Sequence, residues 1–375
     1  MRPKIKIMWL GLRGFPGIQG GVEMHGEKLC PLLAELGCDM HVIVRSPYQP
    51  KEFGDTWHQV RFHRLWAPRS KSLEAIVHST LGVLYAGLIN RPEILHIQAV
   101  GPALVTPLAR LLGLKVVVTH HGPDYERQKW GRIGRLSLQL GERLGMLWSN
   151  ARIVISQGIA NAVRTKYGRE STLIPNGATL PDRPEATDCI DSFGLERGKY
   201  VLLVSRLVPE KRHLDLIEAF NQAAVPGWKL ALVGSSDHPD DYTRAVLGAA
   251  EATPNVVCTG FQTGAALAQL YTHAGVFVLP SSHEGLPIAL LEALSYGLTA
   301  VASDIPANLE VDLPPENYFP LGDVETLAQR IVHFAAQPIT AEEQVSRRDW
   351  VAQRYDWDDI AQKTASLYRQ VVGRE

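Results

Sequence analysis

Apolar strand-like runs alternate with helical stretches along nearly all of the chain, and this alternation restricts the fold more than any other feature. It is typical of doubly wound sheets, in which helices join parallel strands and cover both faces. In the first half, we predict strands at residues 5–11, 40–45, 60–66, 94–98, 115–119, 153–156 and 172–175. The pattern begins again at residues 200–205, 230–234, 256–260, 276–280 and 299–303. We therefore expect an α/β protein with two sheets.

The length of 375 residues also favours two domains, each with its own core. Residues 176–198 are rich in Pro, Asp, Gly and Glu, which indicates a linker. We expect domains at 1–178 and 179–354, followed by a C-terminal amphipathic helix within 355–375. The first 175 residues hold 23 Lys and Arg against 12 Asp and Glu, a net of +11, and the remaining residues hold 15 against 27, a net of −12. This asymmetry suggests that the first domain meets an anionic partner.

Composition excludes several other classes of protein. The hydrophobic fraction of 45% and the charged fraction of 21% are those of a soluble globular protein, and no apolar run reaches membrane-spanning length. The N-terminus lacks the apolar core of a signal peptide, so we expect a cytoplasmic protein. Neither the four cysteines nor the His, Cys and Asp residues show metal-ligand spacing, so we expect reduced thiols and no metal site.

Unusual residues follow the ends of many of the predicted strands. In open α/β sheets, ligands bind outside the carboxyl ends of the strands. We therefore expect one crevice between the two domains to be lined by Gly20, Gly21, His120, His121, Asn176, Arg206, Gly260, Phe261, Glu284, Ser303 and Asp304.

Residues 276–297 form a predicted strand, turn and helix, with Pro287 at the first helical position and Gly297 just after the helix. Glu284 precedes the helix and Glu292 lies within it. Two acids at this spacing can reach along a ligand that lies across the N-terminal end of the helix. The alternative is a loop charge together with a helix charge that is satisfied by a nearby arginine.

Arg206 and Lys211 stand at the entrance to another predicted helix, where the helix dipole disfavours cations. An anion such as a diphosphate would explain them, whereas the alternative is a pair of solvated loop charges. The first loop is glycine-rich but lacks the G-x-G-x-x-G spacing of a dinucleotide site, and the next strand ends in Arg45 rather than an acid. A dehydrogenase is therefore disfavoured. Gly20-Gly21 can admit a phosphate close to the backbone or form a plain tight turn.

His120 and His121 end a buried strand, where histidines are often structural. Their loop faces the expected crevice, so the alternative is that they contact the donor or acceptor.

Taken together, these motifs resemble the family-4 retaining glycosyltransferases of the GT-B fold over nearly the whole chain. The matching motifs are Gly20-Gly21, Thr119-His-His-Gly122, Ile174-Pro-Asn-Gly177, Ser205-Arg-Leu-x-x-Glu-Lys211 and Glu284-Gly-Leu-Pro-x4-Glu292. Residues 13–23 and 121–130 look like those of bacterial members that build cell-surface polysaccharides.

The resemblance implies two Rossmann-like domains that face each other across a cleft, with the C-terminal helix crossing back to the first. Arg206 and Lys211 would hold the diphosphate of the donor. Glu284, together with the Gly285-Leu286 amides, would contact the donor sugar. Glu292 would contact the ribose, and the backbone near Gly260-Phe261 would contact the base. Gly20, Gly21 and His121 would line the sugar and acceptor side, and Asn176 and His120 belong to matching motifs.

The implied activity is a metal-independent, retaining transfer of a hexose from a nucleotide-diphosphate sugar to a glycan or lipid-linked acceptor. No cofactor and no nucleic acid are expected. One alternative is a sugar-nucleotide 2-epimerase of the same fold, which would form its product without any acceptor. Another is a non-catalytic sugar-nucleotide-binding subunit, against which the intact Glu284, Arg206 and Lys211 argue.

Residues 127–152 concentrate the positive charge of the first domain, with six basic residues against the single acid Glu142. Apolar residues are interleaved at near-helical spacing: Trp130, Ile133, Leu136, Leu140, Leu144, Leu147 and Trp148. We predict a basic amphipathic helix that docks on an anionic membrane surface, at the inner face of the membrane. In the alternative, the apolar stripe packs on the sheet and the arginines are merely solvated.

Overall fold

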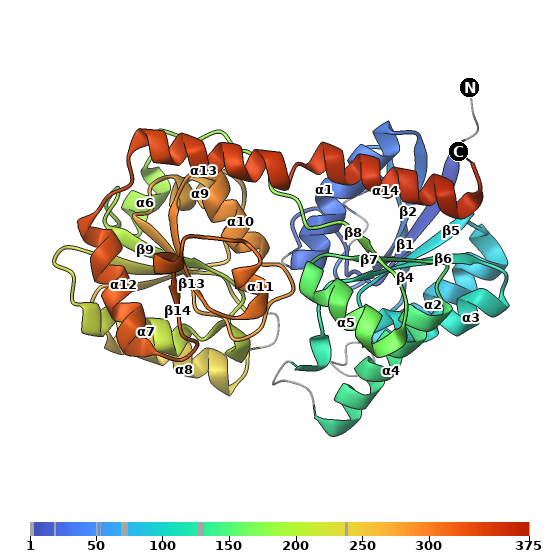
Figure 1. Cartoon of the computed structure of the whole chain (residues 1–375), viewed down its shortest axis with the longest axis horizontal. Coiled ribbons are helices and arrows are strands. Elements are labelled where there is room, and N and C mark those ends of the chain that lie inside the picture. Colours follow the sequence, from blue (N-terminus) through green and yellow to red (C-terminus); the bar gives the residue numbers. More distant parts are fainter. Residues whose placement is uncertain are drawn as a thin grey trace. The chain divides into compact units, whose positions relative to one another are not determined.

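The computed structural model describes residues 4–18, 20–49, 52, 54–68, 74–126, 131–236 and 239–374. It divides into two compact units, of which the first is Met1–Gly177 with Trp357–Glu375 and the second is Ala178–Asp356. Each unit is a sheet with helices on both faces, and the predicted α/β class with two sheets is confirmed (Figure 1). The chain passes between the units at Gly177–Ala178 and again at Asp356–Trp357.

In the first unit, the described residues form an eight-stranded sheet in the order β3-β4-β2-β1-β5-β6-β7-β8. The strands are β1 (Ile5–Leu10), β2 (Cys38–Arg45), β3 (Thr56–Trp57), β4 (Val60–Leu65), β5 (Ile94–Gln98), β6 (Lys115–His120), β7 (Ala151–Val154) and β8 (Thr172–Leu173). The pairs are parallel except β3 with β4. The sheet grows to one side of β1 and then to the other, so its topological switch point lies between β1 and β5.

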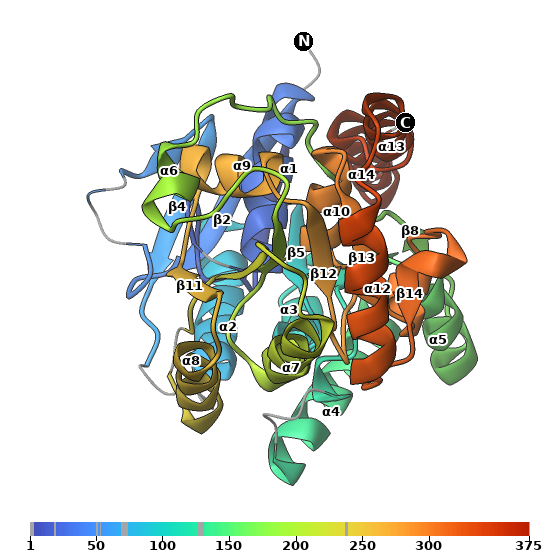
Figure 2. The same ribbon diagram turned by 90° about the vertical axis from the view of Figure 1, so that its left-hand side faces the viewer.

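The helices of this unit are α1 (Gly21–Glu35), α2 (Glu74–Tyr85), η2 (Ala86–Asn90), η3 (Pro102–Val105), α3 (Thr106–Leu111), η4 (Asp124–Glu126), α4 (Arg132–Trp148), α5 (Gln157–Tyr167) and α14 (Trp357–Val372). Although α14 is the last element of the chain, it packs beside α1 (Figures 1 and 2). Gly177 lies against its first residue, and a Cβ there would come within 2.3 Å of the Trp357 ring. The position therefore requires glycine.

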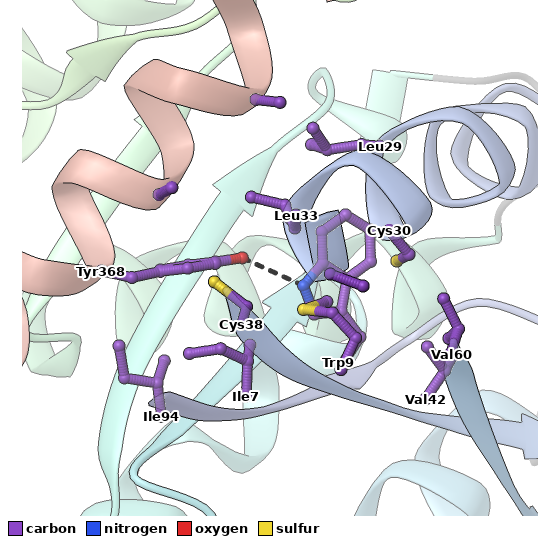
Figure 3. Packing of buried hydrophobic residues seen from close by; sticks show 14 of the residues in the cluster. Ile7, Trp9, Leu29, Cys30, Leu33, Cys38, Val42, Val60, Ile94 and Tyr368 are labelled. Atoms are coloured by element: carbon purple, nitrogen blue, oxygen red, sulfur yellow. Dashed lines mark hydrogen bonds between the residues drawn. The ribbon is translucent and has the colours of Figure 1, made fainter. Parts of the chain in front are cut away.

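Tyr368 carries α14 into the core of the first unit (Figure 3). Trp9 Nε1 donates a hydrogen bond to the Tyr368 hydroxyl over 3.0 Å, and that hydroxyl lies 2.6 Å from His96 Nδ1. A hydroxyl that accepts from the indole keeps its own proton to donate, and a neutral His96 can accept that proton's hydrogen bond at Nδ1. The other ring nitrogen of His96 is 2.7 Å from Thr119 Oγ1. Burial lowers the pKa of His96, as does His25, which fits the neutral imidazole in this chain of bonds.

In the second unit, six strands of the described chain form a parallel sheet in the order β11-β10-β9-β12-β13-β14. They are β9 (Tyr200–Val204), β10 (Lys229–Val233), β11 (Val256–Gly260), β12 (Val276–Leu279), β13 (Thr299–Ser303) and β14 (Tyr318–Phe319). The sheet grows from β9 towards β11 and then from β12 towards β14. Its switch point therefore lies between β9 and β12.

The helices of the second unit are α6 (Asp188–Ser192), η5 (Pro209–Lys211), α7 (His213–Ala223), α8 (Asp241–Ala252), α9 (Gly264–Thr272), α10 (Ile288–Ser295), α11 (Pro306–Leu309), η6 (Pro315–Asn317), α12 (Val324–Ala336) and α13 (Ala341–Arg354). In the described part of both units, no helix combines the length and apolarity needed to cross a membrane. The four cysteines are free thiols.

Replacing Tyr368 with phenylalanine should destabilise the protein, because it leaves the buried Trp9 and His96 nitrogens without their shared partner. We expect the free energy of unfolding, measured by urea denaturation, to fall by about 1–3 kcal/mol. Tyr48→Phe is the control, since that hydroxyl is only half-buried and lies 3.4 Å from Glu74. Equal stabilities of the two variants would contradict the structural role of the Tyr368 hydroxyl.

Candidate functional site

The two loops at the switch point of the second unit contact each other. One follows β9 and the other follows β12, and because these strands are neighbours their loops leave the sheet side by side. Lys211 Nζ and Glu284 Oε1 form an ion pair whose side chains are only 17% and 11% exposed. The Ser282 amide also donates to the Glu210 carbonyl over 2.8 Å. The fold thus joins two predicted site residues that are 73 positions apart.

The loop after β9, which contains Lys211, is shaped by a short 3-10 helix and by a residue in the left-handed conformation. Arg212 has φ 52°, which redirects the chain from η5 into α7. His213 then begins α7, with Nε2 of its ring 3.0 Å from Ser205 Oγ and its amide donating to the Tyr242 hydroxyl over 2.9 Å. Burial and the charge of Lys211 lower the pKa of His213 to about 3, so this imidazole is neutral at pH 7. Arg206 lies half-buried in the same loop.

The loop after β12, which contains Glu284, leads into α10. This helix begins at Ile288, one residue later than predicted, and Pro287 precedes it in an extended conformation. The prediction for Gly297 is confirmed, because it follows the C-cap residue with φ 81°. Gly285 is half-buried and Leu286 is buried beside Glu284 in sequence. Five predicted site residues therefore lie in the two neighbouring loops: Arg206, Lys211, Glu284, Gly285 and Leu286.

Glu292 projects from α10 towards a tyrosine. The Tyr271 hydroxyl donates to Glu292 Oε2 over 3.0 Å, and the Tyr271 ring stacks on Tyr296 at a centroid distance of 5.1 Å. Burial raises the pKa of Tyr271, and the Glu292 carboxylate raises it further, so the hydroxyl stays protonated. Sequence reasoning expected an arginine partner in the structural alternative and missed this tyrosine, which lies 21 residues earlier.

Gly260 and Phe261 lie farther along the sheet. Gly260 is the last residue of β11 and Phe261 follows it, and β10 separates β11 from β9. Gly260 has φ 70° and its carbonyl accepts from the Gly234 amide over 2.8 Å, while Phe261 is 43% exposed.

In the first unit, the glycine-rich loop is tied to the helix that it precedes. Gly20 has φ 155°, and a Cβ there would lie 2.1 Å from Glu23 Oε2, so Gly20 cannot readily be replaced. Glu23 forms an ion pair with Arg13 at 3.1 Å and also accepts from the Arg13 amide. Burial raises the pKa of Glu23, but the charge and hydrogen bonds of Arg13 outweigh burial, and the net shift is downward. This pair was not singled out from the sequence.

The adjacent histidines have different partners. His121 Nε2 is 2.8 Å from Gln98 Oε1, and its ring meets the edge of His25. Burial, His96 and His120 together lower the pKa of His121 to about 3. His120 instead directs Nε2 at Glu142, 2.8 Å away, and accepts the Gly122 amide at Nδ1. Both ring nitrogens of His120 are therefore engaged within the protein.

Glu142 of α4 is the centre of a buried polar cluster. Its side chain is 4% exposed and accepts hydrogen bonds from His120, Tyr125 and Tyr167, with Lys166 at 3.8 Å. Burial raises the pKa of Glu142, but the hydrogen bonds and the charge of Lys166 give a net downward shift. The cluster fixes the loop after β6 to α4 and α5, and the sequence offered no local signal for it.

Asn176, another predicted site residue, is buried one position before Gly177 in the first unit. Among the residues that the structure describes, no group of three or more His, Cys, Asp or Glu side chains is placed to hold a metal ion.

Comparisons with known proteins point to one enzyme class. A family model described as Glycosyltransferase Family 4 matches residues 19–180, and one described as Glycosyl transferases group 1 matches residues 190–348. The chain is 27% identical to the 2-deoxystreptamine N-acetyl-D-glucosaminyltransferase of Streptomyces fradiae, over 95% of this chain and 92% of that protein. It is 33% identical to the GDP-mannose:cellobiosyl-diphosphopolyprenol alpha-mannosyltransferase of Komagataeibacter xylinus, over 49% of this chain and 48% of that protein.

A solved structure shares the whole architecture. Sucrose-phosphate synthase from Thermosynechococcus elongatus superposes with a TM-score of 0.83 at 23% identity, covering 99% of this chain and 100% of that one. At this identity the likeness concerns the fold.

The Glu142 cluster makes stability depend on pH in a defined direction. Because the folded pKa lies below the ordinary value of 4.5, the ionised carboxylate stabilises the protein fully above pH 4.5, and this contribution is lost as pH falls through the folded pKa. We expect Glu142→Gln to lower the free energy of unfolding by about 1–3 kcal/mol at pH 7, and the difference from wild type to shrink below pH 4.5. Urea denaturation across pH measures both.

Glu170→Gln serves as the control, because the Glu170 side chain is 83% exposed in the same unit. A Glu142→Gln deficit that stayed constant down to pH 3 would contradict the downward pKa shift.

Proposed function

The chain belongs to the family-4 type of glycosyltransferases and has their GT-B fold, and from this we propose that it transfers a hexose from a nucleoside-diphosphate sugar to a glycan or lipid-linked acceptor. We propose further that the anomeric configuration is retained, that no metal ion takes part, and that the product enters a cell-surface polysaccharide. The observation that carries the proposal is the contact between Lys211 and Glu284 at the switch point of the second unit.

A switch point is where open parallel sheets bind ligands, and this one presents complementary charges. The Lys211 ammonium and the Arg206 guanidinium are suited to a diphosphate, while a carboxylate such as Glu284 accepts hydrogen bonds from sugar hydroxyls. In the structure Glu284 neutralises Lys211. A bound donor would offer both groups new partners, the phosphates for Lys211 and the hydroxyls for Glu284. The ion pair would thus hold both side chains near the positions that they need.

In the proposed reaction, the bond between the anomeric carbon and the β-phosphate oxygen of the donor breaks. Negative charge then grows on the departing diphosphate, and fixed cations at Lys211 and Arg206 would stabilise it as it forms. The acceptor hydroxyl oxygen bonds to the same carbon on the face from which the diphosphate leaves. Because the new bond forms on that same face, the sugar configuration is retained. The hydroxyl proton passes to the departing phosphate oxygen, so no enzyme base is required.

The acceptor is the less constrained partner. The Komagataeibacter relative is named for a diphosphopolyprenol acceptor, which supports a lipid-linked acceptor here. The net charge of +11 on residues 1–175 supports association with the anionic inner face of a membrane, where such an acceptor would be found.

Glu284→Ala should leave the fold intact and reduce kcat/KM for sugar transfer by about a hundredfold or more, because it removes a contact to the donor sugar. Transfer is followed by release of nucleoside diphosphate and by product analysis with and without acceptor. Glu316→Ala, at an exposed position in the same unit, is the matched control. Wild-type turnover by Glu284→Ala would remove Glu284 from the site.

Lys211→Ala separates the two roles within the pair. It should chiefly weaken the binding of UDP or GDP in calorimetry, since the diphosphate loses a point charge. If Lys211→Ala bound the free nucleotide normally while Glu284→Ala did not, the assigned roles would be reversed.

Sugar transfer should continue in excess EDTA, because cationic side chains take the place that a divalent ion has in metal-dependent transferases. The measurement compares initial rates with EDTA, with added Mg²⁺ and with added Mn²⁺. Loss of activity in EDTA that either ion restored would show that the diphosphate needs a metal.

A further inference from the structure

Helix α4 packs on the first unit with a side that carries two glycines. The buried residues are Leu138, Gly141, Glu142, Gly145 and Met146. Gly141 lies so close to the segment before η3 that a Cβ would come within 2.2 Å of the Val100 carbonyl, and a Cβ on Gly145 would lie 2.8 Å from Ala103. The helix therefore approaches its neighbours through glycines, with Leu138 and Met146 buried beside them, while four other large apolar side chains stay exposed.

Those apolar side chains are on the other side of the helix. Ile133 is 86% exposed, Leu136 65%, Leu140 49% and Trp148 50%. At 3.6 residues per turn they form one stripe, centred opposite the buried side. Leu144 and Leu147 of the predicted stripe are partly buried, so the sequence-based alternative, in which the stripe packs on the sheet, does not hold at the four exposed positions. Leu111 of the neighbouring α3 adds another side chain, 80% exposed.

Positive charge flanks the stripe. Arg132, Arg135 and Arg143 of α4 are exposed, as is Arg110 of α3. The one acid of α3 and α4 is Glu142, which points inward and is held by the buried cluster. The closest acids in sequence, Asp124 and Glu126, belong to η4. The outward side of α4 is therefore basic and apolar.

One basic residue of the sequence pattern, Arg152, is engaged inside the protein. Arg152 lies on β7 and donates to the carbonyls of Met146 and Ser149, so it satisfies the end of α4. Arg127, Lys129 and Trp130 lie outside the described residues.

We propose that the exposed surface of α4, defined by Ile133, Leu136, Leu140, Arg132, Arg135 and Arg143, is a docking surface for an anionic lipid bilayer. The helix would lie in the interface, with the apolar stripe below the headgroups and the arginines among the lipid phosphates. A second copy of the chain fits the surface less well, because two such faces would bring arginines together without acids to pair them.

The proposal deepens the proposed function, on which it rests, by naming where a lipid-linked acceptor would be met. Glu142 joins the two features, because it lies on the buried side of α4 and holds His120 at the start of the His121-Gly122 loop. A bilayer on the outward side of α4 would thus lie one helix diameter from the anchor of that loop, about 10 Å. The loop belongs to the motifs that we associate with the acceptor.

Flotation with vesicles tests the surface directly. Full-length protein is mixed with phosphatidylcholine vesicles or with vesicles that also contain phosphatidylglycerol, at low and high salt. Binding should require phosphatidylglycerol and decrease with salt. Arg132→Glu with Arg135→Glu should reduce the partition coefficient by at least about tenfold. Ile133→Ser with Leu136→Ser should reduce the partition coefficient by a similar factor. Most of this reduction should also be measured at low salt.

Matched controls change the same quantities elsewhere. Arg197→Glu with Arg244→Glu alters net charge equally in the second unit, and Leu247→Ser removes an apolar side chain that is 40% exposed there. Both should bind vesicles like wild type. Calorimetry with UDP and GDP on every variant verifies the fold, and its failure in wild type would count against the proposed function rather than the docking surface.

Three results would overturn the proposal. They are equal binding to neutral and anionic vesicles, an equal loss in the control variants, and wild-type binding by both α4 variants. A lipid-free dimer in analytical ultracentrifugation, dissociated by Ile133→Ser with Leu136→Ser, would instead assign the surface to a second copy.

Discussion

The order of strands in the second sheet determines which residues of this protein can act together. Lys211 and Glu284 form their ion pair because β9 and β12 are neighbours in the sheet, although η5, α7, β10, α8, β11 and α9 lie between these two strands in sequence. The apolar strands create this adjacency, since each must be buried on both faces and so recruits helices to both sides of the sheet. Burial of the apolar strands therefore brings together the polar loops at their carboxyl ends. The side chains of these loops need not contribute to that packing, so they can contact a ligand.

Much of this arrangement can be predicted from the sequence, because continuous apolar runs such as 200–205 and 276–280 have few other stable environments. The strands that were not predicted, β3 and β14, are two residues long and offer no period to detect. The direction in which a side chain points is harder to predict from the sequence than the strands are. His120 and His121 are neighbours with similar surroundings in sequence, yet their partners, Glu142 and Gln98, lie 22 and 23 residues away and come from different elements.

The amphipathic helix α4 shows a different limit. Periodicity predicts that a helix has an apolar side, and in most surface helices that side is the buried one. Here the buried side is chosen by Gly141 and Gly145, because only a residue without Cβ allows the backbone of α4 to come so close to the segment around Val100. The spacing of these glycines was visible in the sequence. Spacing alone does not identify a packing surface, because an apolar stripe is the stronger signal for burial and the two signals point to opposite sides.

Net charge and local charge also point in different directions. The half of the chain with a net of −12 is the one that presents Lys211 and Arg206 to the proposed diphosphate. In the half with a net of +11, burial lowers the pKa of His121 to about 3, so this imidazole is neutral. Ionic screening resolves this difference, since charges farther than about 8–10 Å act weakly across water at physiological salt. A ligand at the switch point therefore responds to the nearest side chains. A membrane is large enough to contact many residues at once, so at the proposed docking surface it would respond to the summed charge of the exposed arginines of α4. The two proposed recognition events can therefore coexist in one chain.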